Sequence, residues 1–84
     1  MINVAICDDV VSTTGKIETM LQNIAKRNFM PVDTDVFWKG EHLVDSVEMG
    51  NSFDIIFLDI QLADGNAFDF LSVVHPNSVI IFTT

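Results

Sequence analysis

Three aspartates stand directly after apolar runs of the chain. Residues 2–7 read INVAIC and lead into Asp8 and Asp9, and residues 55–58 read IIFL and lead into Asp59. A charged group at the end of a buried run is costly unless it meets a partner, because burial strips it of water. The repeated pattern predicts that the three carboxylates serve one purpose.

The segments that lead into these aspartates are predicted to be strands. Residues 2–7, 53–58 and 78–82 are almost continuously apolar, which is typical of strands covered on both faces. Residues 32–38 instead alternate, with aspartates on one side, and this pattern indicates a half-exposed edge strand. Four strands are therefore expected.

Apolar residues at helical spacing predict three helices between these strands. They are Ile17, Met20, Leu21, Ile24 and Ala25 in the first helix, Leu43, Val44 and Val47 in the second, and Phe68, Leu71 and Val74 in the third. The hydroxyl side chains of residues 12–14 are expected to cap the start of the first helix, and Asn28 lies near its end.

Strands and helices that alternate in this way predict a parallel sheet with helices on its faces and right-handed crossovers. Ligands of such sheets bind beyond the carboxyl ends of the strands, where the strand order reverses. If the first and third strands are neighbours, about 4.8 Å apart, Asp8, Asp9 and Asp59 converge in one crevice. Thr84, at the end of the last strand, brings a hydroxyl to the same rim.

Converging carboxylates predict a bound cation. Two carboxylates about 4 Å apart repel each other by roughly 4 kcal/mol at an effective dielectric constant of about 20. A hard divalent ion with oxygen ligands offsets this repulsion, and Mg²⁺ suits one or two carboxylates together with waters and a phosphate. Taken alone, the pair Asp8-Asp9 is equally well explained by the preference of acidic side chains for a helix N-terminus.

The combined motifs resemble the receiver domain of two-component response regulators. These motifs are an acidic pair after the first strand, an apolar strand that ends in FLDI, and a threonine after the fourth strand. The segments ICDD, FDIIFLDIQL and IIFTT are similar in particular to receivers joined to LytTR-type DNA-binding domains. The resemblance implies a flavodoxin-like (CheY-like) three-layer α/β fold with the strand order 2-1-3-4-5. Residues 1–84 would form one incomplete domain with the order 2-1-3-4, lacking the fifth strand and the last helices.

The resemblance also implies a role for each residue of the crevice. Asp59 would be the phosphoacceptor, which takes a phosphoryl group from the phosphohistidine of a sensor histidine kinase. Asp9 and Asp59 would ligate Mg²⁺ directly, and Asp8 would position the ion through water. The backbone carbonyl of Gln61 would be a further ligand. These assignments suit phosphoryl transfer, which depends on positioning and charge neutralisation.

Thr84 would be the switch hydroxyl that contacts the phosphoryl group, and Thr83 is the alternative if the strand slips by one residue. The chain departs from the family at Ala63, where receivers commonly have proline, and at Asn66-Ala67, where they have a pair such as Asp-Gly. No residue corresponds to the family's lysine at the end of the fifth strand. Because the lysine, the fifth strand and the last helices are missing, the segment is expected to be a fragment of a longer regulator. Any binding of DNA would belong to a missing C-terminal output domain, whose identity the sequence leaves open.

Composition restricts the partners of this segment. Its net charge is −8, from 12 acidic and 4 basic residues, which argues against direct contact with nucleic acid. No run approaches the roughly 18 apolar residues of a membrane span, and the first residues lack the features of a signal peptide. The single cysteine, Cys7, has no partner for an internal disulfide, so a cytoplasmic setting is expected.

Residues 78–82 would lie at the edge of an incomplete sheet. An exposed apolar edge strand invites pairing with another strand, so a homo-oligomer through this strand is expected.

An alternative to the phosphoacceptor site is a nucleotide-binding loop, which Thr14-Gly15-Lys16 suggests. The pattern of that loop fails, however, because Val10 stands where it needs glycine and Ile17 where it needs serine or threonine.

Two functions from different classes remain open on the sequence. In the first, the chain accepts a phosphoryl group on Asp59 and signals through a change of shape. It would turn over no external substrate beyond its phosphodonor, so it is not expected to be an enzyme. In the second, the chain lacks a working switch, binds metal at most, and acts as a module for interaction or oligomerisation.

Overall fold

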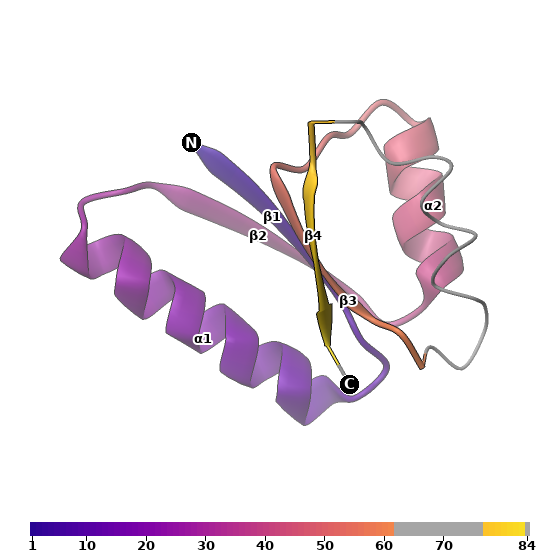
Figure 1. The fold of residues 1–84 in the computed structure, drawn as a ribbon, viewed down its shortest axis with the longest axis horizontal. Coiled ribbons are helices and arrows are strands. Elements are labelled where there is room, and N and C mark those ends of the chain that lie inside the picture. The colour runs from indigo at the N-terminus through magenta and orange to yellow at the C-terminus, as the bar shows by residue number, and fades with distance from the viewer. Residues whose placement is uncertain (62–76, 84) are drawn as a thin grey trace.

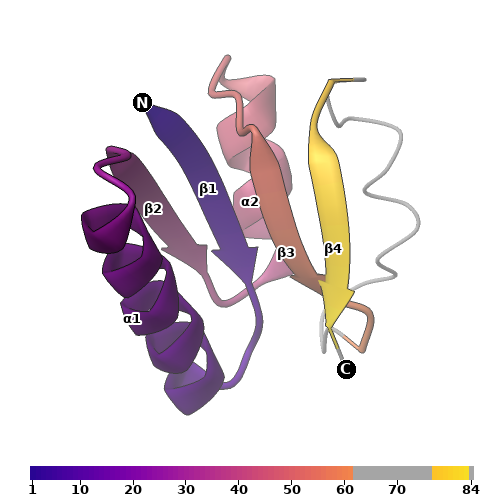
Figure 2. The ribbon, with the colours of Figure 1, turned by 60° about the vertical axis from the view of Figure 1, so that its left-hand side comes forward.

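A four-stranded sheet in which all neighbouring strands run parallel forms the centre of the molecule. The computed structural model describes residues 1–61 and 77–83. The sheet order is β2-β1-β3-β4, with β1 at Ile2–Cys7, β2 at Val32–Phe37, β3 at Ile55–Asp59 and β4 at Val79–Thr83. Helices α1 (Val11–Arg27) and α2 (Gly40–Glu48) lie on opposite faces of the sheet (Figures 1 and 2). The predicted three-layer α/β fold with the flavodoxin-like order 2-1-3-4 is confirmed.

A cluster of buried side chains lies between the sheet and α2. Its buried members are Ala5, Cys7, Leu43, Phe53, Ile56 and Leu58. Phe37 meets Phe53 edge to face, with ring centroids 5.9 Å apart. Val44 and Val47 pack against the same cluster, so the predicted apolar side of the second helix is confirmed. Burial of each large aliphatic side chain contributes about 1.5–3 kcal/mol.

The other face of the sheet is covered by α1, which packs against β1 and β2. The predicted apolar stripe of this helix is only partly buried. The helix itself is confirmed, but along its apolar stripe Ala25 is buried and Leu21 half-buried, whereas Met20 and Ile24 are exposed. The reason is the position of the helix, which lies over one half of the sheet (Figure 2).

The start of α1 differs from the prediction. Val10, with an extended backbone and no side-chain cap, precedes the helix, so the expected hydroxyl cap was wrong. The Thr14 hydroxyl instead donates to the carbonyl of Val11 within the first turn. The helix ends as expected at Asn28, whose side-chain amide donates to the carbonyl of Ile24. Among the described residues, no helix combines the length and apolarity that crossing a membrane requires.

Strands β3 and β4 begin later than predicted, at Ile55 and Val79, and each extends one residue further, to Asp59 and Thr83. The apolar pattern of residues 78–82 is typical of a buried strand, but an incomplete sheet was expected to leave this strand as an exposed edge. The second expectation is confirmed for the described residues, because β4 lies at the end of the sheet order with much of its side-chain surface exposed. The predicted third helix, with Phe68, Leu71 and Val74, falls outside the described residues.

Candidate metal centre

The register of the sheet places Asp8 beside Asp59. Strands β1 and β3 are parallel neighbours, and Cys7 of β1 is paired with Leu58 of β3. Asp8 and Asp59 are the next residues along each strand, so both stand at the carboxyl edge of the sheet. Since parallel strands all end at the same edge, residues that are distant in sequence meet there.

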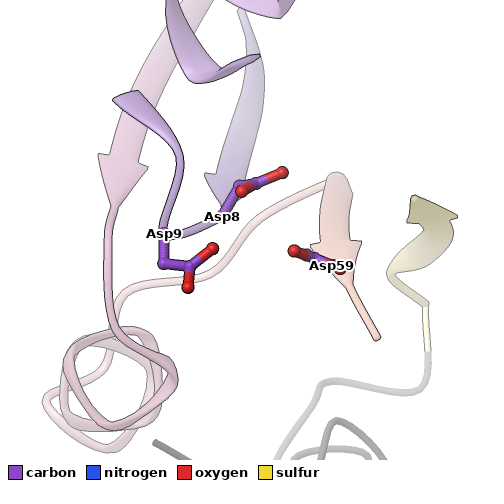
Figure 3. A group of neighbouring side chains, drawn as sticks. All are labelled: Asp8, Asp9 and Asp59. Atoms are coloured by element: carbon purple, nitrogen blue, oxygen red, sulfur yellow. The ribbon is translucent and has the colours of Figure 1, made fainter. Parts of the chain in front are cut away.

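Asp8, Asp9 and Asp59 form one cluster. Each offers a carboxylate oxygen, and these three oxygens lie within 4.8 Å of one another. Figure 3 shows the carboxylate of Asp59 reaching from the end of β3 toward the other two. Asp8 is 4% exposed and Asp59 is 7% exposed, whereas Asp9 is exposed. The cluster is therefore a site with two buried carboxylates and one that faces solvent.

Backbone amides fix the two buried carboxylates. The N–H of Val10 donates to Oδ1 of Asp8, and the N–H of Gln61 donates to Oδ1 of Asp59, both at 2.9 Å. The main chain of Asp8 is also anchored, because its N–H donates to the carbonyl of Phe37 at the end of β2. Among the described residues, the hydrogen bonds to these two carboxylates thus come from the backbone.

The cluster concentrates negative charge, because three carboxylates meet at one edge of the sheet. At an effective dielectric constant of about 20, two charges 4.8 Å apart repel by about 3.5 kcal/mol. A divalent cation offsets this repulsion. Because all three side chains offer oxygen only, the ligand set fits a hard ion such as Mg²⁺ and not a thiolate- or imidazole-bound metal.

The structure brings together the three predicted acidic residues and locates two further candidates. Gln61 lies in the turn after β3, where its N–H contacts Asp59. Thr83 is paired with Asp59 in the sheet, and the carbonyl of Thr83 accepts the N–H of Ile60 at 3.2 Å. Thr84 falls outside the described residues, as do the departures Ala63 and Asn66-Ala67.

Sequence reasoning missed the backbone donors of the site. The amides of Val10 and Gln61 orient the carboxylates, yet their side chains carry no sign of this role. The only available signal was spacing, since each donor follows its aspartate by two residues. Aspartate commonly binds the backbone two residues on, which is the hydrogen bond of an Asx turn.

Comparisons with known proteins assign no family to this chain. No protein-family model matches it, and no curated protein matches it. The interpretation of the site therefore depends on the residues that form it, on their distances and on their burial.

Proposed function

We propose that the chain is a phosphoacceptor receiver module of a two-component signalling pathway. Asp59 accepts the phosphoryl group, and Asp8 and Asp9 complete a site for Mg²⁺. One observation carries the proposal, namely that three carboxylates from two parallel strands converge within 4.8 Å at the carboxyl edge of the sheet. The motifs around them, ICDD and FLDI, resemble those of receivers.

Asp59 is suited to act as the nucleophile. It is the last residue of a buried strand, and the N–H of Gln61 holds one of its oxygens. In the proposed step a carboxylate oxygen of Asp59 forms a bond to phosphorus. The bond between phosphorus and the imidazole nitrogen of the kinase breaks, and that nitrogen keeps the electron pair and takes up a proton. The product is an acyl phosphate on Asp59.

In this proposal Asp8 and Asp9 help to hold a Mg²⁺ ion. Mg²⁺ bound at this site supplies the charge that offsets the oxygens of the phosphoryl group. Asp9 and Asp59 are its proposed direct ligands, Asp8 positions it through water, and the carbonyl of Gln61 completes the protein's share. Two of these four groups are already fixed by the backbone, which reduces the ordering needed for binding.

The proposal extends to partners and setting. A sensor histidine kinase donates the phosphoryl group, and the chain itself turns over no other substrate, so it is not an enzyme in the usual sense. A cytoplasmic location agrees with the single cysteine of the sequence, Cys7, which is buried and forms no disulfide among the described residues. Output would pass to a DNA-binding domain that regulates transcription.

A second function is favoured by a different observation. Strand β4 lies at the end of the sheet order and exposes apolar side chains. A chain with such an edge could act as an interaction module whose acidic cluster binds metal without accepting phosphate. Phosphate chemistry at Asp59 separates the two functions.

Incubation with Mg²⁺ and a small phosphodonor such as phosphoramidate, followed by intact mass measurement, tests the proposal. The wild-type chain is expected to gain one phosphoryl group and Asp59→Asn none. Asp54→Asn is the matched control, because Asp54 lies on the same segment at the opposite end of β3 and its carboxylate accepts the N–H of Asn3. This control should be phosphorylated like the wild type.

Two results would overturn the phosphoacceptor function. One is a folded wild-type chain that gains no phosphoryl group from the donor and shows no amide shifts at Val10 and Gln61 with Mg²⁺ and beryllofluoride. The other is an Asp59→Asn chain that is phosphorylated as fully as the wild type. The first result would leave the interaction module as the leading function.

A further inference from the structure

Phe29 exposes almost its whole ring directly after α1. Its side chain is 95% exposed, the largest exposed fraction among the large apolar residues of the described part of the chain. Its backbone has a φ of 53°, in the left-handed region that is unfavourable for a residue with a Cβ. The N–H of Phe29 donates to the carbonyl of Lys26, and that of Met30 to the carbonyl of Ala25. A hydrogen-bonded turn therefore presents the ring to solvent.

A groove borders Phe29 on one side of α1. It lies between the end of α1 and the start of β2, has a volume of about 520 Å³, and is lined in part by Gln22, Lys26, Met30 and Val32. Figure 2 shows α1 running against the direction of β2, so that the last turn of the helix lies beside the start of the strand. The groove combines apolar surface with the ammonium group of Lys26.

Positive charge is concentrated at this end of α1. Lys26 and Arg27, in the last turn, are two of the four basic residues of the chain, and both are exposed. Residues 19–32 contain no acidic residue, although the whole chain has 12. Basic side chains at the end of a helix complement its dipole, which explains their position but not the exposed ring beside them. The end of α1 is thus basic and apolar on a chain of net charge −8.

The acidic residues nearest in sequence do not cancel this charge. The hydroxyl of Thr34 donates to a carboxylate oxygen of Glu18 at 2.7 Å, so Thr34 faces α1. Because the side chains of a strand alternate between its two faces, Asp33 and Asp35 lie on the opposite face of the sheet. Glu18 lies about 12 Å before Lys26 along the helix, which is more than the Debye length of about 8 Å at physiological ionic strength.

We propose that this groove docks an acidic peptide segment of a partner protein. A carboxylate of the segment pairs with Lys26 or Arg27. An apolar side chain next to it packs against Phe29 and enters the groove beside Met30. Aromatic residues, methionine and arginine are enriched at protein interfaces, and this surface offers all three.

The docking surface is separate from the acidic cluster. It lies at the edge where the parallel strands begin, whereas the three aspartates stand at the edge where β1 and β3 end. It also lies at the end of the sheet order opposite to β4. The inference is therefore independent of phosphorylation at Asp59.

A short segment suits this surface better than a membrane does. At physiological ionic strength a short peptide senses charges within about 8 Å, so it meets mainly the local positive charge. A membrane is wider than the molecule and also faces its excess of acidic residues. Clusters of roughly 4–8 basic residues are typical of surfaces that bind anionic lipids, whereas Lys26 and Arg27 are two.

Amide NMR of the isotope-labelled chain tests the proposal with a synthetic peptide, Glu-Glu-Leu-Phe-Glu-Asp-Glu with blocked ends. The amides of Lys26, Phe29 and Met30 should shift as the peptide is added, and those of Val10 and Gln61 beside the acidic cluster should not. The contact is smaller than the roughly 800 Å² per partner of a stable complex, so we expect a dissociation constant of about 0.1–1 mM.

Two control peptides separate the parts of the contact. One replaces every acidic residue with its amide, and the other replaces the leucine and phenylalanine with serine. Each should bind at least about fivefold more weakly than the first peptide, because each lacks one of the two kinds of contact.

Variants of the chain test the same two contacts. Phe29→Gly should weaken binding about tenfold although glycine suits the backbone at this position, so the loss cannot arise from unfolding. Lys26→Gln should weaken it about threefold. Met49→Ala and Lys39→Gln are the matched controls, since Met49 is an exposed apolar residue after α2 and Lys39 a basic residue before it. Both should bind like the wild type.

Three results would overturn the proposal. The first is a folded wild type whose amides at residues 26–30 do not shift up to about 5 mM peptide, well above the expected dissociation constant. The second is an equal shift with the neutral control peptide. The third is binding to vesicles of phosphatidylserine and phosphatidylcholine without binding to the peptide, which would assign the surface to a membrane. Shifts at these amides that follow the concentration of the chain alone would instead assign the groove to a second copy.

Discussion

Asp8 and Asp59 are held in the same way at the ends of neighbouring strands. Oδ1 of Asp8 accepts the N–H of Val10, and Oδ1 of Asp59 accepts the N–H of Gln61, both at 2.9 Å. In each case the donor follows the aspartate by two residues. Asparagine keeps the Oδ1 acceptor but removes the charge, whereas alanine removes both. The role of charge can therefore be measured separately from the role of the hydrogen bond.

Asp59→Asn is predicted to stabilise the chain when divalent cations are absent. The variant keeps the bond from Gln61 and removes one of three carboxylates that lie within 4.8 Å of one another. The free energy of unfolding should rise by about 1–3 kcal/mol, as measured in urea with a chelator present. Asp54→Asn should stay within about 0.5 kcal/mol of the wild type. A loss of stability in Asp59→Asn would show that repulsion between the three carboxylates does not destabilise the folded chain.

Mg²⁺ is predicted to stabilise the wild type through the same cluster. An ion that binds only the folded state at ten times its dissociation constant adds about 1.4 kcal/mol to the free energy of unfolding. Asp9→Asn and Asp59→Asn should lose most of this gain. Sodium chloride at equal ionic strength is the control, because screening alone also weakens repulsion between carboxylates. Equal effects of the two salts would argue against a specific site.

The sheet and the acidic cluster were predictable because both follow from alternation. Apolar runs separated by helical patterns require a parallel sheet, and a parallel sheet brings the ends of its strands to one edge. Asp8 and Asp59 are 51 positions apart in the sequence. They become neighbours in space because β1 and β3 are adjacent in the sheet. The role of Thr84 stays a prediction, because that residue lies outside the described part of the chain.

Two features could not be predicted from residue types. The orientation of Asp8 depends on the amide of Val10, and every residue other than proline has such an amide. Periodicity identified the apolar side of α1, but it could not tell how much of the sheet the helix covers. Ile24 shares that side with Ala25, yet the first is exposed and the second is buried.

Asp8→Ala is predicted to be less stable than Asp8→Asn by about 1–3 kcal/mol. Both variants remove the charge, but only alanine leaves the N–H of Val10 without its acceptor just before α1. Urea unfolding of the two variants side by side measures the difference, and the shared loss of charge cancels from it. Equal stability would mean that water replaces the carboxylate at no cost.

Phe29→Gly is predicted to stabilise the end of α1. Phe29 has a φ of 53°, in the left-handed region that favours glycine. The N–H of Phe29 donates to Lys26 and that of Met30 donates to Ala25, which together form a Schellman motif. Because the Phe29 ring is 95% exposed, its removal costs little burial. The gain in the free energy of unfolding should be about 0.5–1 kcal/mol, after the greater backbone freedom of glycine is deducted.

Gly50→Ala is predicted to have the opposite effect. Gly50 follows α2 with a φ of 102°, and a Cβ there meets no atom within 4 Å, so any cost arises from the backbone alone. The free energy of unfolding should fall by about 1–2 kcal/mol. Gly15→Ala is the matched control, because Gly15 lies inside α1 with equally open surroundings and should gain about 0.5–1 kcal/mol. Urea unfolding of both variants checks the signs, and two changes in the same direction would contradict the backbone conformation at Gly50.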